Sequence, residues 1–254
     1  QNLSFLEKLL VVWGLTWGFL GLALYLLGLV SLFYQGIVIG LWIIFLLLAL
    51  CLCQKIKIGQ SWRIFFKNFR ANLKKDKLFF LVLALFCIFA LINLFAALAP
   101  ELGYDALWYH LTLPKIYLLT HTIRFLPGQA LYYSVMPRLV EIFYAVGLSF
   151  DSWGILAKIV HYSFGLAWAV GIYVLSRQFL ARRTSILMTL AAYGTIIVSW
   201  HSQTGYIDLA VAFFALMAMW ALLRFLKTGN DLFLNLGAVF MGFNLASKIF
   251  GIII

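Results

Sequence analysis

The chain has 254 residues, of which 65% are hydrophobic and 11% are charged, and its formal net charge is +11. This composition excludes an ordinary soluble domain, in which about a quarter of the residues are charged. Eight of the 19 basic residues fall in one short segment between apolar runs: Lys55, Lys57, Arg63, Lys67, Arg70, Lys74, Lys75 and Lys77. Such clustering is typical of a cytoplasmic loop in a membrane protein, so we expect membrane lipids as partners and no nucleic acid.

Apolar runs follow one another along the chain and predict an all-α, polytopic bundle of transmembrane helices, because about 20 apolar residues cross a hydrocarbon core of about 30 Å. We expect the spans to be Leu9–Leu32, Ile37–Leu52, Leu78–Leu98, Trp153–Leu175, Ser185–Trp200, Ile207–Leu226 and Leu232–Ile254. The first run is too long for a signal-peptide core, so we expect it to be retained. Since the sequence begins without Met and stops inside an apolar run, we expect it to be part of a longer protein.

A further apolar piece, Arg138–Phe150, is too short to cross a membrane and is expected to lie at the interface or to form a re-entrant helix. The basic segment 55–77 interleaves Trp62 and several Phe residues with its charges, which predicts an amphipathic helix on the inner leaflet.

The positions of the charges also predict an orientation. If residues 55–77 are cytoplasmic, the N-terminus is cytoplasmic too, because two spans precede this segment. Residues 99–151 then lie outside, with the bases Lys115, Arg124 and Arg138 against the acids Glu101, Asp105, Glu141 and Asp151. We therefore expect a multi-pass protein of the inner cell membrane whose active site faces the external side.

The external segment opens with an acidic and aromatic stretch that runs from Glu101 to His110. Where charge is scarce, a carboxylate beside a membrane boundary is a candidate for function, which favours Asp105. On a regular helix Asp105 and Tyr109 share one face, whereas His110 lies about 140° away from Asp105. Pro114 is expected to break or restart the helix. The alternative role of Asp105 is that of a helix N-cap, and the two roles are compatible.

Three ordered motifs carry a resemblance to a known family. They are Tyr104-Asp105 through His110, Pro114-Lys115 and Tyr117; Thr204-Gly-Tyr206-Ile-Asp208; and Gly242-x-x-x-Ala246-Ser-Lys248. Together they resemble the GT-C superfamily of membrane glycosyltransferases, in particular the family 39-like branch of protein O-mannosyltransferases and aminoarabinose transferases. The resemblance covers about residues 78–254 and divides the chain into two N-terminal spans with the basic loop, 1–77, and a C-terminally incomplete GT-C-like module, 78–254.

This resemblance implies an inverting glycosyltransferase that moves a sugar from a polyprenyl-phosphate donor to an acceptor hydroxyl at the external face. In that family the acid of the first external loop is catalytic, which implies that Asp105 is the base; a positioned carboxylate can accept the hydroxyl proton. Family members commonly carry a second acid beside the first or two residues later, where this chain has Ala106 and Leu107. We therefore expect no cofactor and keep a divalent metal as the less favoured alternative.

Other residues could complete such a site. Asp208 could position the sugar or the acceptor, or it could be an acid favoured at a helix start. Lys248 lies about 24 Å along its span, where it could hold the donor phosphate or extend to the interface. Lys115 and Arg138 are weaker phosphate candidates, and Tyr109, His110, His201 and Tyr206 are candidates for substrate contact. A haem or metal site on His161 and His201 is disfavoured, because no His pair has ligand spacing with carboxylates.

Two other classes of function remain open alternatives. The first is a non-catalytic multispan subunit or scaffold of a larger membrane complex. The second is a transporter, which predicts helices interrupted by Gly or Pro near the middle of the membrane. The sugar and the acceptor are left open.

Overall fold

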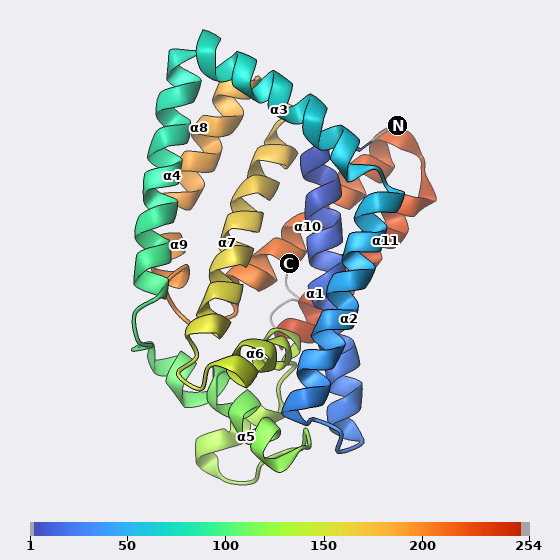
Figure 1. The fold of residues 1–254 in the computed structure, drawn as a ribbon, viewed down its shortest axis with the longest axis vertical. Coiled ribbons are helices and arrows are strands. Elements are labelled where there is room, and N and C mark those ends of the chain that lie inside the picture. Colours follow the sequence, from blue (N-terminus) through green and yellow to red (C-terminus); the bar gives the residue numbers. More distant parts are fainter. Residues whose placement is uncertain (1–2, 250–254) are drawn as a thin grey trace.

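The fold is built entirely from helices. The computed structural model describes residues 3–249, and within that range the chain contains no β-strand. The helices form one bundle whose two ends differ (Figure 1). At one end α3 (Ile58–Lys75) lies across the other helices, and the opposite end carries η1 (Ala106–His110), α5 (Thr112–Thr120), η2 (Gln129–Val135) and α6 (Leu139–Phe150).

Five helices are long and apolar enough to cross a membrane. They are α1 (Phe5–Leu29), α2 (Gln35–Lys55), α4 (Lys77–Ala97), α7 (Ile155–Ser176) and α10 (Asp208–Thr228). Each matches a predicted span to within a few residues. Helix α1 starts where the sequence supplies a capping box: Ser4 Oγ accepts a hydrogen bond from the Glu7 N–H, and Glu7 Oε2 accepts one from the Ser4 N–H.

The predicted span Ser185–Trp200 is wrong as one continuous helix. It is divided into α8 (Arg182–Tyr193) and α9 (Ile196–His201), and Thr195 caps the second piece by accepting a hydrogen bond from the Val198 N–H. Gly194 between them has little helix propensity, which explains the position of the break. Thr195 and Ile196 are exposed on the bundle surface, whereas the discontinuous helices of transporters face a central substrate site.

The last predicted span, Leu232–Ile254, is only partly seen as a helix. Helix α11 (Asp231–Ser247) covers its first part and is shorter than the five long helices. Lys248 follows the helix in an extended conformation. Residues 250–254 of the predicted span lie outside the described part of the chain.

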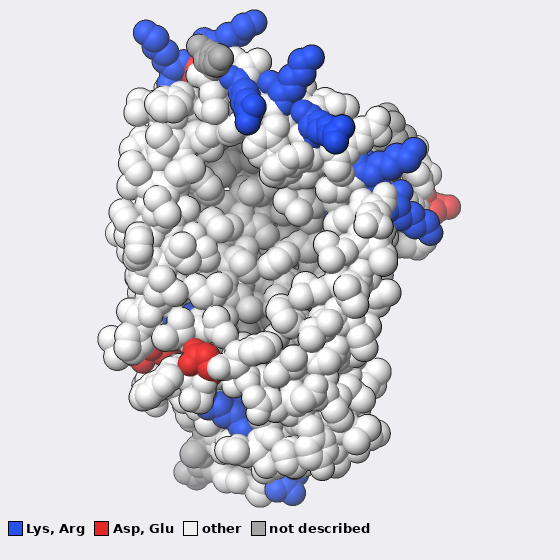
Figure 2. Space-filling view, in the orientation of Figure 1, with Lys and Arg blue, Asp and Glu red and all other residues white. Residues whose placement is uncertain are grey.

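The amphipathic helix predicted from the basic segment is present as α3. Its bases form a row along one end of the molecule (Figure 2). Asp76, between α3 and α4, caps α4 through the Phe79 N–H and lies 2.8 Å from Arg183 Nε. The hydrogen bond from Arg183 and that from the Phe79 N–H hold the pKa of Asp76 at about 2. Through these contacts Asp76 connects the junction of α3 and α4 to the start of α8.

Helix α6 lies inside the bundle. Every residue from Leu139 to Ser149 is buried, so this helix is covered by other parts of the protein, and whether it lies at the membrane interface or is re-entrant stays a prediction. Much of its packing is apolar: the ring of Phe143 packs against Trp17 of α1 and Phe164 of α7. Because α6 is held by the long helices, it forms a firm base for the loops at this end.

Two glycines of α1 permit close packing with α10 and α11. A Cβ atom on Gly14 would lie 2.6 Å from a ring carbon of Phe240, and a Cβ atom on Gly18 would overlap the ring of Phe243. Small residues let aromatic rings approach the backbone of a neighbouring helix. Gly36 and Gly40, at the same spacing on α2, face open space within 4 Å.

Candidate functional site

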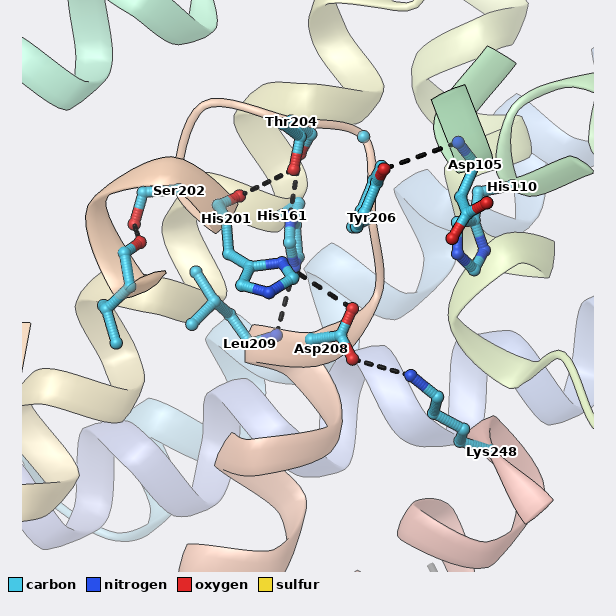
Figure 3. A network of polar contacts seen from close by, with 12 residues as sticks. Asp105, His110, His161, His201, Ser202, Thr204, Tyr206, Asp208, Leu209 and Lys248 are labelled. Carbon is cyan, nitrogen blue, oxygen red and sulfur yellow. Dashed lines mark hydrogen bonds and ion pairs between the residues drawn. The ribbon is translucent and has the colours of Figure 1, made fainter. Parts of the chain in front are cut away.

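The candidate site forms around Asp208, the first residue of α10 (Figure 3). Lys248 Nζ donates a hydrogen bond of 2.7 Å to Asp208 Oδ1. His201 Nδ1 lies 3.7 Å from Asp208 Oδ2. The Asp208 and Lys248 side chains each keep 34% exposure, so the ion pair is open to a ligand. Three of the residues predicted for the site are thereby brought into direct contact.

His161 holds the loop before α10 in place from the neighbouring helix α7. Its Nδ1 lies 2.8 Å from the Thr204 carbonyl oxygen, and its Nε2 accepts a hydrogen bond from the Leu209 N–H. Since Nε2 accepts, the proton is on Nδ1 and the ring is neutral. Both ring nitrogens are therefore used in bracing the backbone, which leaves neither free for a metal. Among residues 3–249 no group of three His, Cys, Asp or Glu side chains is arranged to hold a metal ion.

Asp105 meets the same loop from the opposite side. Its backbone N–H donates to Tyr206 Oη at 3.4 Å, so Tyr206 connects the segment that carries Asp105 with the loop that carries Asp208 (Figure 3). The Asp105 carboxylate makes no capping hydrogen bond, and its backbone is already helical. Asp105 therefore stands at the start of the helix, as the N-cap alternative expects, but its side chain does not cap it. The carboxylate is half-buried and has no structural hydrogen bond among those of the described residues.

The helix that follows Asp105 is a single π-helical turn. The Leu111 N–H donates to the Ala106 carbonyl oxygen, five residues earlier. A π turn has more residues per turn than an α-helix, so the angle of about 140° between Asp105 and His110 that a regular α-helix implies does not apply here. Isolated π turns often occur at functional sites. Helix α5 starts one residue after this turn, close to the predicted restart at Pro114.

His110 is fixed by an acid that the sequence did not single out. Its Nδ1 lies 2.8 Å from Glu141 Oε1 on the buried helix α6, and both side chains are almost fully buried. His110 thus anchors the π turn to α6 and is a positioning residue in this structure. Glu141 is one of only eight acids in the chain, and this scarcity is the one sequence signal that marks it.

Tyr109 belongs to the π turn that follows Asp105. Its ring stacks on Tyr133 of η2 with ring centroids 4.1 Å apart. Burial raises the pKa of Tyr109 well above its usual range, and the nearby Asp105, Tyr133, Glu141 and Asp208 raise it further. The phenol therefore stays protonated at neutral pH and can donate a hydrogen bond.

Glu101 joins the two loops of the site. Its carboxylate accepts hydrogen bonds from the backbone N–H groups of Leu102 and Gly103 and, across 104 residues of sequence, from that of Gly205. The Tyr144 hydroxyl of α6 also donates to the Tyr206 carbonyl oxygen. No local sequence pattern marks these contacts, because their partners lie far away in the chain. These hydrogen bonds hold the loop that carries Asp105 against the loop that carries Asp208.

Two predicted phosphate contacts lie elsewhere. Arg138 donates hydrogen bonds to the Tyr117 hydroxyl and the Met136 carbonyl oxygen, and it lines a separate cavity of about 460 Å³ with Arg124. Lys115 is half-buried on α5, and the structure shows no contact between it and Asp105 or Asp208. The structure therefore brings Asp208, Lys248 and His201 together and joins Tyr206 beside them to the segment that carries Asp105, Tyr109 and His110, while Arg138 and Lys115 make their contacts elsewhere.

The gathered residues combine an open carboxylate, a phenol donor and an ammonium group. Burial lowers the pKa of His201; Asp208 opposes this shift, while Lys248 and His110 add to it. His201 is therefore neutral at pH 7 and can accept or donate a hydrogen bond. Such a set can accept a proton at Asp105 and bind an anionic group at Lys248.

No protein family, curated protein or solved structure matches this chain. The proposed function therefore rests on the residues of this site and their geometry.

Proposed function

We propose that the chain is an inverting membrane glycosyltransferase that takes its sugar from a polyprenyl-phosphate donor. The proposal combines the resemblance to the GT-C superfamily with the composition of the site. The observation that carries it is that Tyr206, two residues before the Asp208–Lys248 ion pair, is hydrogen-bonded by the backbone N–H of Asp105, whose carboxylate has no hydrogen bond among those of residues 3–249. Asp208 and Lys248 are 40 residues apart in sequence, Asp105 and Tyr206 are 101 residues apart, and charge is rare in this chain.

In the proposed reaction Asp105 is the base. An acceptor hydroxyl attacks the anomeric carbon of the donor sugar, and its proton passes to the Asp105 carboxylate. The bond from the anomeric carbon to the phosphate oxygen breaks, and polyprenyl phosphate leaves with the electron pair. The new glycosidic bond forms on the face opposite the leaving group, so the configuration inverts.

Lys248 is proposed to stabilise the leaving phosphate. An ammonium group has three N–H donors, and one of them bonds to Asp208. The other two can bind phosphate oxygens as negative charge develops there. Asp208 orients the ammonium group and, together with His201, can contact sugar hydroxyls. Tyr109 and Tyr206 supply aromatic faces and phenol donors beside them.

The proposed location follows from the distribution of charge. The basic row along α3 lies at the end of the bundle opposite the site (Figures 1 and 2). If basic segments stay in the cytoplasm, the site faces the outside of the inner cell membrane. A lipid-linked donor would reach it from the outer leaflet, with its isoprenoid chain remaining among the lipids.

The test is conversion of the donor by the full-length protein in proteoliposomes. A polyprenyl-phosphate hexose is supplied with a membrane extract as the source of acceptor, and release of polyprenyl phosphate is measured. We expect release by the wild type and by Asp231→Asn, which changes an exposed acid in the first turn of α11. We expect Asp105→Asn to be inactive. Equal release by Asp105→Asn and the wild type would remove this mechanism, and no release by any form would favour the scaffold alternative.

A further inference from the structure

A second polar cavity lies at the end of the bundle that carries α3. It has a volume of about 610 Å³ and is lined by three bases, Arg177, Arg224 and Lys227, and by one carboxylate, Glu7. The lining is therefore net positive. This cavity is formed by residues of α1, α3, α7 and α10 and is separate from the site around Asp105, at the opposite end of the molecule.

The carboxylate in this cavity is already engaged. Glu7 Oε2 accepts a hydrogen bond from the Ser4 N–H, and Glu7 Oε1 accepts one from Trp220 Nε1 at 3.2 Å. Arg224 Nη1 lies 3.8 Å from the same Oε1, too far for a hydrogen bond. Glu7 thus balances part of the charge of Arg224 without satisfying its N–H groups.

The unsatisfied atoms among the lining residues are all donors. Arg224 Nε, Arg224 Nη2 and Gln178 Nε2 are buried and have no hydrogen-bond partner within the part of the chain that the structure describes. Buried polar atoms in folded proteins are almost always paired, so three unpaired donors around one cavity call for an acceptor. A group with several oxygens and a negative charge, such as a phosphate, matches both the charge and the missing acceptors.

A second, apolar cavity adjoins the polar one beneath α3. The second cavity has a volume of about 170 Å³ and shares Leu6, Phe65 and Tyr173 with the first. The rest of its lining is almost wholly apolar: Phe69, Phe79, Leu83, Phe86, Val170 and Ile186, with Thr189. Figure 2 shows this face of the molecule hollowed below the basic row of α3. A positively charged cavity beside an apolar cavity can bind a molecule that has an anionic headgroup and an apolar chain.

We propose that these two cavities together bind one anionic phospholipid. Its phosphate is held by Arg224, with Arg177 and Gln178 around it, once the tips of Arg224 and Gln178 turn toward the cavity. One acyl chain lies along Phe69, Leu83 and Ile186. A free anion would use only the polar compartment, whereas a phospholipid accounts for both. The lipid would lie between α3 and the helices α1, α4 and α7. Its binding does not depend on the proposed sugar transfer.

The test is lipid retention by the full-length protein in detergent, measured by native mass spectrometry. Phosphatidylglycerol is titrated against phosphatidylcholine, which has no net charge. We expect phosphatidylglycerol to bind tightly and Arg224→Gln to weaken it by about tenfold or more, as loss of a hydrogen bond to a charged group implies. Lys67→Gln is the matched control, because Lys67 is an exposed base of α3 outside both cavities, and we expect it to bind as the wild type does.

Two further variants keep the test decisive if Arg224→Gln does not fold. Arg177→Gln changes an exposed lining residue, and Leu83→Trp fills the apolar compartment. We expect both to weaken phosphatidylglycerol binding. Equal binding of the two lipids, or unchanged binding in Arg177→Gln and Leu83→Trp, would overturn the proposal. Displacement of phosphatidylglycerol by millimolar glycerol phosphate would also overturn it, since it would indicate a site for a free anion.

Discussion

Lys248 donates a 2.7 Å hydrogen bond to Asp208 and thereby joins the end of α11 to the start of α10. Each partner keeps about a third of its side-chain exposure, at 34%. An ion pair this exposed contributes little to stability, about 1 kcal/mol or less, because water screens it. The position of this pair beside His201 is therefore better explained by binding than by folding.

Replacement of Lys248 separates these two roles. We expect Lys248→Gln to change the free energy of unfolding by less than about 1 kcal/mol. We expect the same variant to bind polyprenyl phosphate about tenfold more weakly, because a charge-assisted hydrogen bond to phosphate is lost. Lys248→Arg keeps the charge and should recover most of the binding. Thermal unfolding and a lipid-binding titration measure the two effects. Unchanged binding in Lys248→Gln would remove this residue from the donor site.

His201 should make the stability of the protein sensitive to mild acid. Burial lowers its pKa in the folded state below the ordinary value of 6.5. The unfolded chain therefore binds the proton more readily, so stability is present above pH 6.5 and falls as the pH drops toward the folded pKa. We expect the melting temperature to fall between pH 7.5 and pH 5.5. In His201→Gln the fall should be smaller. If the two proteins respond equally to pH, His201 is not the titrating group.

The glycines of α1 and α2 offer a matched pair for packing. A Cβ atom at Gly18 overlaps the ring of Phe243, whereas one at Gly40 meets nothing within 4 Å. We expect Gly18→Ala to lower the free energy of unfolding by about 1–3 kcal/mol, because the core must shift to admit the methyl group. We expect Gly40→Ala to raise it by about 0.5–1 kcal/mol through the intrinsic helix preference of alanine. Effects of the same sign at both sites would contradict this packing of α1 on α11.

Much of the architecture was predictable because helix length and composition are local properties. The apolar runs around α1, α2, α4, α7 and α10 predicted the five long helices, and the basic, aromatic segment predicted α3. The division at Gly194 was missed, since hydropathy does not register a single residue of low helix propensity. The burial of α6 could not be predicted from the sequence, because it depends on which other helices pack around it.

The candidate site was predictable where charge is scarce. Asp105, Asp208 and Lys248 stand out in a chain with 11% charged residues, and the structure brings the last two into contact. The roles of Glu101 and Glu141 were missed, because their partners lie 104 and 31 residues away. The prediction that Arg138 contacts the donor phosphate missed its hydrogen bond to Tyr117 for the same reason, because Tyr117 is 21 residues away in sequence.

The measurement that tests the central claim most directly compares Asp105→Asn with the wild type in two assays on the same full-length protein. The substitution keeps the shape of the side chain and removes its ability to accept a proton. If Asp105 is the base, sugar transfer from a polyprenyl-phosphate donor falls by about 100-fold or more while donor binding stays within about twofold. Transfer at the wild-type rate, or loss of transfer only in proportion to lost donor binding, would contradict the account.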